Sequence, residues 1–557
     1  MSRGRRPRGA PGPARRGPTP RAGREWLPRL EWAAALLLTL LVLALHVGFL
    51  THAGPLWRDE VNSVEFARMP TLSSIYESLR YDGFPMLPSL LLRGWAAIGL
   101  GGSDLGYRLF GLVVGGGFVV ALWWVCRVLG CGPPLLSLAL VGLNPWAVRA
   151  MDSVRPYGIG MLFIVLTMGL LWRALESPGW KRFLAAGAVA VLSVQCMYQN
   201  AFLLLALGLA AAVAAWRGSR PGAVTGVVLV GAAAAVSLLV YAPAISAARS
   251  WNVVVQTPST LKQMLAVLTE AMGSSSPILP WLWVGLGVVS CVAGARALRE
   301  RRAPAPSGRT PSASLYGAGV LIAAAVVFLA AIKVTRLPTQ PWYYVPLAAL
   351  VAPAIDAGVR ATGGGAFRMG RLGLAVLIAG ATVIPAWRQV TERRTNVDRV
   401  ASYLGREASA GDAVVVFPFY FGVSFHRYYR GAASWTTVPP IQDLRIHRYD
   451  LLKEVMTRPN AMEPVLTTME EALRSGHRVW LVGGLPPPDM TQPAPSIPPA
   501  PHPVSGWFGQ PYVLTWGQEG SYFLTNHAGS IDIVPDLGQA AASPYERVTL
   551  MVASGWR

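Results

Sequence analysis

Long apolar stretches, separated by short polar ones, fill most of the chain between residues 32 and 388. The first stretch, residues 32–51, has about twenty residues, enough as a helix to cross a hydrocarbon core of roughly 30 Å. The pattern therefore predicts a polytopic membrane protein of mainly α class with about eleven transmembrane helices. We place these helices at residues 32–51, 108–129, 134–152, 156–174, 182–197, 200–216, 223–246, 278–298, 315–333, 342–358 and 371–388.

The pattern changes near Arg388, beyond which polar residues, prolines and short mixed segments replace the apolar runs. A helical pattern at 396–408 precedes a strand-like run at 413–417, and residues 469–475 and 478–482 repeat this order. We therefore predict a soluble α/β domain at 389–557, after a transmembrane domain at 31–388. The α/β domain has no GxGxxG, Walker or GxSxG motif, so nucleotide binding and hydrolase chemistry lack support.

Composition agrees with a membrane protein, because 53% hydrophobic and 14% charged residues leave too little polar surface for a soluble globule. The net charge of +21 owes much to residues 1–30. We predict that this Pro/Gly-rich tail is disordered, lies in the cytoplasm and contacts anionic lipid, with no nucleic acid as partner. A cleaved signal peptide is the alternative for the first span, although no small-x-small cleavage site follows before Asp59.

The basic residues also orient the predicted spans. With the N-terminus inside, the loops assigned to the inside carry arginines and lysines, as the positive-inside rule requires. Residues 52–107 then form an outer loop, and the α/β domain is extracytoplasmic. We expect a multi-pass protein of the plasma (inner) membrane, and the Ala, Gly and Arg content is consistent with a GC-rich bacterial genome. The cysteines, at 126, 131, 196 and 291, indicate no disulfide framework in the outer domain.

Within the outer loop, residues 84–100 carry apolar side chains at helical spacing. We predict an amphipathic helix in the membrane interface that holds Tyr81 and Asp82 near the surface. A short true span is the alternative, and two spans here would then be needed to keep the same sidedness.

The acidic pair Asp59-Glu60 lies just beyond the first span and directly after Arg58. Two carboxylates held at a membrane surface favour a catalytic or binding site over a purely anchoring role. Asp59 is our candidate general base, because a positioned carboxylate that removes a hydroxyl proton contributes typically about 10²–10⁴-fold. Glu60 either shares that role or orients the base. The alternatives are an Asp59 that only pairs with Arg58 and a Glu60 that is a solvated surface charge.

Several short motifs follow one another in order over residues 30–175. They are Asp59-Glu60, Tyr81-Asp82-Gly83-Phe84-Pro85, Leu90-Leu91-Leu92-Arg93, Tyr107-Arg108-Leu109, Asn144-Pro145 and Asp152-Ser153-Val154-Arg155-Pro156-Tyr157. This order resembles the membrane-embedded GT-C glycosyltransferases, most of all the bacterial relatives of protein O-mannosyltransferases and aminoarabinose transferases (glycosyltransferase family 39). Phe84-Pro85-Met86 stands where those relatives often have His-Pro-Pro.

The resemblance implies a GT-C-like helical bundle with an inverting glycosyltransferase activity. Such enzymes move a sugar from a polyprenyl-phosphate donor to a protein, lipid or glycan acceptor on the non-cytoplasmic side, in the cell envelope. By position, Asp59 matches the catalytic acidic residue that these enzymes carry in the first outer loop, and Glu60 matches the acidic residue that commonly follows it.

A departing lipid phosphate needs fixed cations, preferably arginine. Our donor phosphate-binding candidates are Arg155, Arg108, Arg58 and Arg336, of which Arg155 is foremost because it begins a span on the outer side. Snorkelling to lipid headgroups is the alternative for each. The candidate substrate-binding residues are Tyr81, Asp82, Asp152 and Tyr157. Asp152 lies one helical turn before Arg155, so we expect these two side chains to pair.

The sequence leaves metal binding and the class of protein open. None of the seven histidines belongs to a His-x-x-His or His-Glu-x-x-His motif, so we expect no dedicated zinc site. A divalent ion, Mg²⁺ or Mn²⁺, bridging Asp59, Glu60 and the donor phosphate remains open. A transporter or flippase of lipid-linked sugars is the alternative function, although no inverted repeat supports it. A scaffold whose outer domain recognises envelope polymer is a third possibility.

Overall fold

The computed structural model describes residues 26–557 apart from 219, 249–259, 274–275, 301–311, 336–338, 364, 503–506 and 536–541. Within these residues, nine helices are long and apolar enough to cross a membrane. They are α1 (Trp26–His52), α5 (Asp104–Val128), α8 (Pro156–Glu176), α10 (Asn200–Arg217), α11 (Pro221–Ser237, continued by η5, Leu239–Tyr241, and α12, Ala242–Ala248), α14 (Leu279–Glu300), α15 (Ala313–Thr335), α16 (Pro341–Ala361) and α17 (Gly365–Val390). The predicted polytopic helical class is confirmed. The short helix α13 (Leu261–Gly273) precedes α14.

Two of the predicted spans are not single long helices, which is why the number falls below eleven. Residues 134–152 divide into α6 (Leu135–Ser137), a π-helical turn η4 (Leu138–Gly142) and α7 (Pro145–Asp152). The Asn144 side chain accepts hydrogen bonds from Trp146 N and Ala147 N, at 2.9 and 3.2 Å, and so starts α7 afresh at Pro145. The segment predicted at 182–197 is α9 (Trp180–Cys196), whose 17 residues are marginal for a straight crossing.

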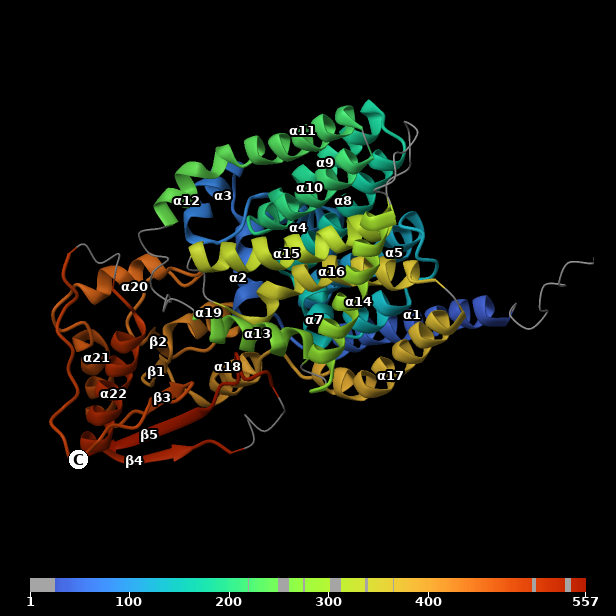
Figure 1. The fold of residues 1–557 in the computed structure, drawn as a ribbon. Helices are drawn as coiled ribbons and strands as arrows, with labels where there is room; N and C mark the ends of the chain where they lie inside the picture. Colours follow the sequence, from blue (N-terminus) through green and yellow to red (C-terminus); the bar gives the residue numbers. More distant parts are fainter. Residues whose placement is uncertain are drawn as a thin grey trace, which may run out of the picture.

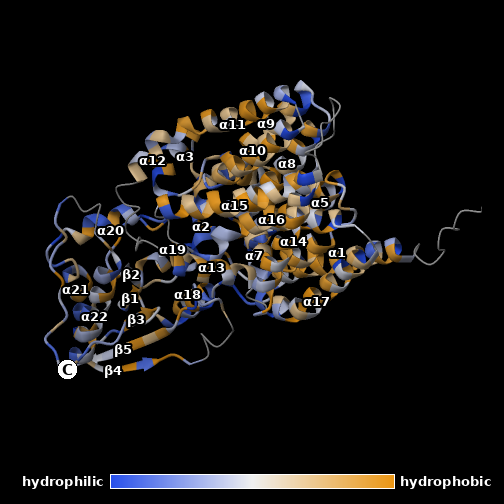
Figure 2. Cartoon of the chain, viewed as in Figure 1, coloured by the Kyte–Doolittle hydropathy of each residue, from blue (hydrophilic) through white to orange (hydrophobic). Residues whose placement is uncertain are grey.

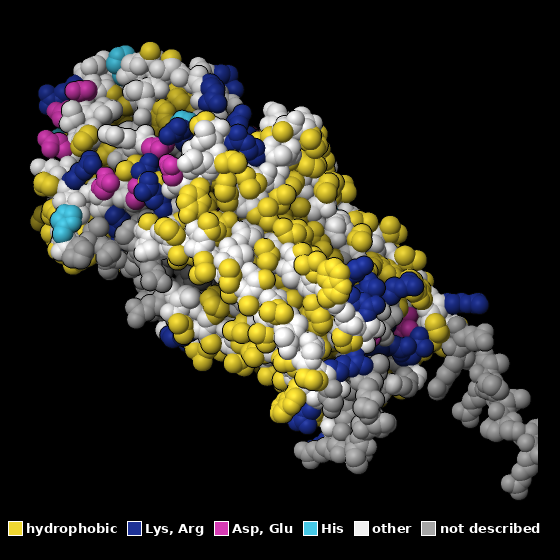
Figure 3. Space-filling view, turned by 90° about the horizontal axis from the view of Figure 1, so that it is seen from above, with side chains coloured by type: hydrophobic (Ala, Val, Ile, Leu, Met, Phe, Trp, Pro, Cys, Tyr) yellow, Lys and Arg dark blue, Asp and Glu magenta, His cyan; other side chains and the backbone are white. Residues whose placement is uncertain are grey.

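Figure 1 shows the long helices packed side by side, with α16 in their midst. Within the most apolar window of α16, 89% of the residues are buried inside the protein, against 28% for α17 at the edge. Figure 2 shows that this helical part is predominantly hydrophobic. In Figure 3 hydrophobic side chains cover its middle, whereas charged side chains gather toward both ends, as expected for a body that faces lipid around its waist. The N-terminal boundary is corrected, because residues 26–30 already belong to α1; residues 1–25 lie outside the described residues.

The segment between α1 and α5, which we call the outer segment after its predicted side of the membrane, is largely helical. It contains α2 (Arg58–Arg68), α3 (Leu72–Ser78), η2 (Leu79–Tyr81), α4 (Leu87–Trp95) and a π-helical turn η3 (Ala96–Leu100). The apolar helix predicted at 84–100 is therefore present as α4 and η3. Its Leu92 packs with Val61 and Val64 of α2, so this helix is one support of the acidic pair that α2 carries.

The C-terminal part is an α/β unit, as the sequence predicts. Its elements are α18 (Val397–Glu407), β1 (Ala413–Val416), η7 (Phe419–Phe421), α19 (Gly422–Tyr428), β2 (Ser434–Thr437), α20 (Tyr449–Met456), α21 (Glu463–Arg474), β3 (Val479–Val482), α22 (Gln510–His527), β4 (Ala528–Ile533) and β5 (Leu550–Trp556). The sheet order is β2-β1-β3-β5-β4. β1 pairs in parallel with β2 and β3, and β5 pairs antiparallel with β3 and β4.

β1 and β3 are runs of apolar residues that are buried along their whole length, so both faces of the sheet are covered. Ala413 and Val415 point into a core shared with α20, α21 and α22, while Val414 and Val416 point to α18 and α19. The α/β unit contacts the outer segment through α19, which lies beside α2 in Figure 1. There Arg427 Nη2 lies 2.7 Å from Asp104 Oδ1, and Tyr428 OH donates to Asp104 Oδ2 at 2.7 Å.

Candidate active site

Asp59 lies in the first turn of α2, where the positive end of the helix dipole favours a carboxylate. Its side chain is 24% exposed. The backbone N–H of Arg58 donates to Glu546 Oε2 at 3.0 Å, and the Arg58 guanidinium donates to Tyr545 O. The start of α2 is therefore tied to a segment near the C-terminus of the chain.

Only one oxygen of the Asp59 carboxylate is engaged among the described residues. His447 Nε2 lies 3.2 Å from Asp59 Oδ1, and Arg58 Nε lies 3.7 Å from the same oxygen. Arg155 Nη1 donates to the backbone carbonyl of Asp59 at 3.0 Å. Burial acts to raise the pKa of Asp59, but the His447 hydrogen bond and the charges of Arg155 and Arg58 outweigh it and hold that pKa below its ordinary value. Asp59 is therefore a carboxylate at neutral pH with an oxygen left for a substrate proton.

Glu60, the neighbouring acid, is in the opposite situation. It is fully buried and accepts four hydrogen bonds, from Arg108 Nη1 at 3.0 Å, Arg108 Nη2 at 3.0 Å, Trp57 N at 3.2 Å and Val154 N at 3.1 Å. Arg108 spends two further donations on Gly54 O and Pro55 O. We call Glu60, Arg108 and their backbone partners the Glu60 cluster. It fixes α2 against α5 and the start of α8, and neither Glu60 nor Arg108 lines either of the two clefts described below.

The expected pair of Asp152 with Arg155 is wrong. Asp152 is buried and both of its carboxylate oxygens lie within 2.8 Å of His46 Nδ1, on α1. The reason is that α7 ends at Asp152, so the intervening residues are not a helical turn and the two side chains diverge. Asp152 thus joins α7 to α1 and lines neither of the clefts described below.

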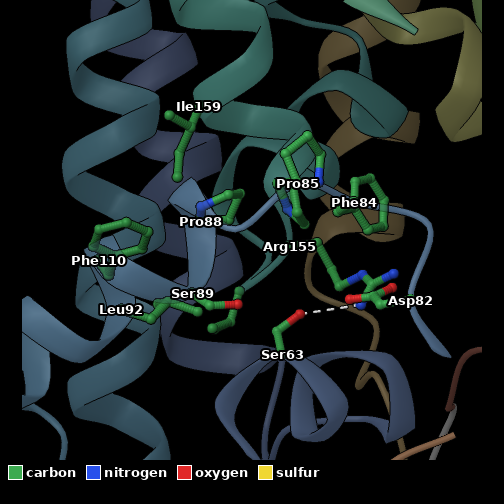
Figure 4. A pocket seen from close by; sticks show the side chains of 12 residues that line it. Ser63, Asp82, Phe84, Pro85, Pro88, Ser89, Leu92, Phe110, Arg155 and Ile159 are labelled. Atoms are coloured by element: carbon green, nitrogen blue, oxygen red, sulfur yellow. Dashed lines mark hydrogen bonds between the residues drawn. The ribbon is translucent and has the colours of Figure 1, made fainter. Parts of the chain in front are cut away.

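Arg155 stands between two clefts and lines both. Its Nη1 also donates to Ser63 Oγ at 3.0 Å, and its guanidinium carbon lies 4.8 Å from the centre of the Phe84 ring. In the first cleft, which we call the Phe84 cleft, Figure 4 shows the Arg155 guanidinium beside the Asp82 carboxylate on one side, with Phe110 and Ile159 away from them. Burial raises the pKa of Asp82, against the opposing charge of Arg155.

The second cleft, which we call the arginine cleft, brings Asp59 together with three arginines. About 360 Å³ of space, partly open to solvent, lies between its side chains. It is lined by Trp57, Asp59, Trp146, Arg149, Ala150, Ser153, Arg155, Tyr157, Trp342 and Arg394. The indoles lie close together, with ring centres 6.0 Å apart for Trp146 and Trp342 and 6.4 Å for Trp57 and Trp342. Cations, aromatic faces and one carboxylate therefore converge on a single space.

Arg394 is the most unusual of these cations. It is 6% exposed, its Nε has no hydrogen-bond partner, and no ion pair to its guanidinium is present among the described residues. Its guanidinium carbon lies 4.7 Å from the centre of the Trp57 ring. Burial and then the charge of Arg149 lower the pKa of Arg394 to about 10, which still leaves it charged at neutral pH. Arg149 itself pairs with Glu392 at 2.7 Å. Burying a cation without a partner costs several kcal/mol of desolvation. An anionic ligand bound beside the cation would offset this cost.

The remaining predicted site residues are spread around these clefts. Tyr157 lines the arginine cleft and Asp82 the Phe84 cleft, whereas Tyr81 lies under the Arg448 guanidinium, 4.5 Å from ring centre to carbon. Arg58 packs between the rings of Trp57 and Tyr420, at 4.9 and 5.0 Å. Arg336 lies outside the described residues.

A divalent ion bridging Asp59 and Glu60 does not fit this geometry, because both Glu60 oxygens are occupied by hydrogen bonds. In the part of the chain that the structure describes, no group of three or more His, Cys, Asp and Glu side chains is arranged to hold a metal ion.

Sequence reasoning missed His447, Arg149 and Arg394. His447 is 388 residues from Asp59 in the chain, and no local pattern marks it. Arg149 and the Arg393-Arg394 pair had a usable signal, because each is a cation next to apolar segments.

No protein-family model matches the chain, and a comparison with curated proteins gives no match. Solved structures do show similarity. ArnT from Cupriavidus metallidurans bound to undecaprenyl phosphate is similar over 81% of this chain and 92% of its own, at 13% identity and a TM-score of 0.47. The oligosaccharyltransferase of Archaeoglobus fulgidus in the apo form is similar over 96% of this chain and 74% of its own, at 11% identity and a TM-score of 0.48. Both TM-scores lie below 0.5, so these structures are likenesses that assign no role to any residue of this chain.

Proposed function

We propose that the protein is an inverting glycosyltransferase that moves a sugar from a polyprenyl-phosphate donor to an extracytoplasmic acceptor. The observation that carries the proposal is the arginine cleft, where the half-engaged carboxylate of Asp59 opens into a space lined by Arg149, Arg155 and Arg394. A carboxylate and a group of cations in one cleft suit a reaction that removes a proton at one point and releases a phosphate at another.

In this proposal Asp59 Oδ2 removes the proton of an acceptor hydroxyl. The acceptor oxygen attacks the anomeric carbon from the face opposite the phosphate, the anomeric C–O bond breaks, and its electron pair stays on the phosphate. The lowered pKa of Asp59 keeps it ionised at neutral pH, and general-base catalysis by a positioned carboxylate is typically worth about 10²–10⁴-fold.

The departing phosphate would meet the arginine cluster. The buried Nε–H groups of Arg394 and Arg155 have no hydrogen-bond partner among the described residues. Charge-assisted hydrogen bonds from guanidinium to phosphate are roughly twice as strong as neutral ones, and fixed donors need no reorganisation as charge develops. We therefore assign the donor phosphate to Arg149, Arg155 and Arg394, and give Arg108 and Glu60 a supporting role.

The aromatic side chains of the arginine cleft suit the rest of the donor. Trp57, Trp146 and Trp342 present ring faces and edges that stack on sugars or on the first isoprene units. Tyr157 lies at the same cleft and packs against Phe84, with ring centres 5.4 Å apart. The proposal extends to topology: the N-terminal end of α1 faces the cytoplasm, the membrane domain runs from α1 to residue 388, and residues 389–557 form an extracytoplasmic domain.

The test is release of free polyprenyl phosphate by the purified full chain in nanodiscs. A panel of polyprenyl-phosphate hexoses and pentoses serves as donors, with membrane extract as acceptor. We expect release by the wild type, its loss in Asp59→Asn, and its retention in Glu77→Gln, which removes an exposed carboxylate of the same outer segment. Equal release by wild type and Asp59→Asn would remove Asp59 from the mechanism. Absence of release from every donor would favour a transporter of lipid-linked sugars.

A further inference from the structure

The carboxyl ends of β1 and β2 are connected to the next elements by segments that contact α2. The segment after β1 brings Tyr420 onto the Arg58 guanidinium and Arg427 within 3.4 Å of Glu65. The segment after β2 brings His447 to Asp59. Loops at the carboxyl ends of parallel strands are where α/β folds place functional groups. Here these loops reach a carboxylate that belongs to the membrane part of the chain.

His447 is fixed to α2 at two points. Its backbone N–H donates to Asn62 Oδ1 at 2.9 Å, and its Nε2 lies 3.2 Å from Asp59 Oδ1. Asn62 and Asp59 are three residues apart, so they share one face of the helix. The imidazole also stacks on Tyr449, with ring centres 5.6 Å apart and planes at 22°. The imidazole therefore has one orientation, with its side chain 9% exposed.

This orientation decides the hydrogen bond. Because the Asp59 carboxylate can only accept, His447 Nε2 must carry the proton. The donation occupies Oδ1 and leaves Oδ2 without a hydrogen-bond partner among the described residues, and Asp59 is one of the residues that line the arginine cleft. The other ring nitrogen, His447 Nδ1, is buried and has no hydrogen-bond partner among the described residues. We therefore do not assign His447 as the group that takes the substrate proton.

We propose that His447 is a positioning residue, through which the C-terminal α/β unit orients the Asp59 carboxylate and completes the active site. The inference rests on the proposed function, since it assumes that Asp59 is the base. In the reaction the acceptor proton moves to Asp59 Oδ2 as the acceptor–carbon bond forms. The Nε2–H of His447 stays on the imidazole throughout and is neither consumed nor transferred.

The electrostatics of Asp59 give the test its readout. The ionisable side chains that surround it, on the outer segment, α7–α8, α16 and the C-terminal part, are Arg58, Asp82, Arg155, Tyr157, Tyr343, Arg394, Tyr449 and Glu546. After burial, the His447 hydrogen bond is the largest influence on the pKa of Asp59, and it lowers that pKa. Removing the hydrogen bond should raise the pKa, so the acid limb of the pH–rate profile should move to higher pH.

The experiment compares His447→Ala, His447→Gln and the exposed-histidine control His502→Ala in the donor-release assay. His447→Ala should lower kcat by about 10–100-fold, the value of a hydrogen bond to a charged group, with the KM for donor unchanged and the acid limb moved upward. The glutamine side chain keeps a donor for Asp59, so His447→Gln should restore most of kcat and the wild-type acid limb. His502→Ala should match the wild type. Thermal unfolding of each variant verifies that it is folded.

Two outcomes would overturn the inference. A folded His447→Ala with wild-type kcat and an unmoved acid limb would mean that the contact does not position the base. A folded His447→Gln as inactive as Asp59→Asn would mean that the imidazole itself exchanges the proton. Both leave the proposed function standing as long as Asp59→Asn is inactive. An active Asp59→Asn refutes the proposed function, and with it this inference.

Discussion

The Glu60 cluster and the arginine cleft begin one residue apart on α2, yet they differ in every physical respect. Glu60 has four hydrogen bonds, a buried counter-charge and no exposure, whereas Asp59 has one engaged oxygen and a side chain that is 24% exposed. Arg108 makes four donations, whereas Arg394 has an unpaired guanidinium among the described residues. An ionic cluster whose hydrogen-bonding groups are all used, which we call saturated, supports the fold. A neighbouring cluster with groups left free, which we call unsaturated, is suited to binding a ligand.

The largest effect on stability should come from breaking the saturated side of this comparison. Arg108→Met leaves the Glu60 carboxylate buried without its counter-charge, which should cost about 3–5 kcal/mol. The midpoint of thermal unfolding in nanodiscs measures it. Arg68→Met is the control, because Arg68 is 56% exposed and its ion pair with Glu65 spans 3.6 Å, a surface pair worth about 0–1 kcal/mol.

A double variant sharpens this prediction. Removing the charge of both partners, as in Glu60→Gln with Arg108→Met, should recover part of the lost stability, because no unpaired charge remains buried. If Arg108→Met were as stable as Arg68→Met, the Glu60 cluster would not be the support of α2 that its geometry indicates.

The next largest effect concerns the unsaturated side. Arg394→Gln should weaken donor binding by about 10–100-fold, the value of a charge-assisted hydrogen bond. Because the variant also removes an unpaired buried cation, its thermal midpoint without donor should rise. Titration of a polyprenyl phosphate and thermal unfolding measure the two effects, with Arg399→Gln as an exposed control on α18. Lower stability together with unchanged donor binding would make Arg394 a structural residue.

The smallest effect is a pH dependence at the segment that ties the C-terminal part to α2. Burial raises the pKa of Glu546 from 4.5 to about 7. The native state then binds more protons than the unfolded state between these values, so this carboxyl contributes stability at low pH that is lost as pH rises through 7. The loss is on the order of 1–3 kcal/mol. Asp59, with its lowered pKa, acts with the opposite sign and loses its contribution as pH falls.

Thermal midpoints of the wild type and Glu546→Gln between about pH 5 and about pH 8 measure this difference. This pH range is chosen because the pKa of Glu546 is 4.5 when unfolded and about 7 when folded. The variant should gain stability relative to the wild type as pH rises, because its side chain cannot ionise. Glu77→Gln, which removes an exposed carboxylate, should run parallel to the wild type. Parallel curves for Glu546→Gln as well would show that Glu546 does not titrate in this range.

The sequence predicted nine of the long helices in the described residues and the α/β unit correctly, because both depend on local periodicity. It singled out Asp59 as an acid beside an apolar run, and the role of Asp59 stays a prediction. It misassigned Asp152 because the partner that decides its role, His46, lies on another helix. The same holds for Glu60 and Arg108. A charge in a sequence shows that chemistry is possible, and only its three-dimensional partners decide whether that charge is already satisfied.

Arg394 and His447 illustrate the second limit of sequence reasoning. Both lie beyond the last span, in the part of the chain where the sequence predicted a soluble α/β domain and named no site residue. Their approach to α2 depends on how the α/β unit packs against the outer segment, which is a matter of long-range packing and not of local pattern.

The central claim is that Asp59 acts on the reaction and not on the fold or on donor binding. The most direct measurement compares Asp59→Asn with the wild type for both binding and release of the same polyprenyl-phosphate sugar. We predict that the variant is folded and binds donor within about threefold of the wild type, while release falls by about 10²–10⁴-fold. Release at the wild-type rate by the folded variant would contradict the account.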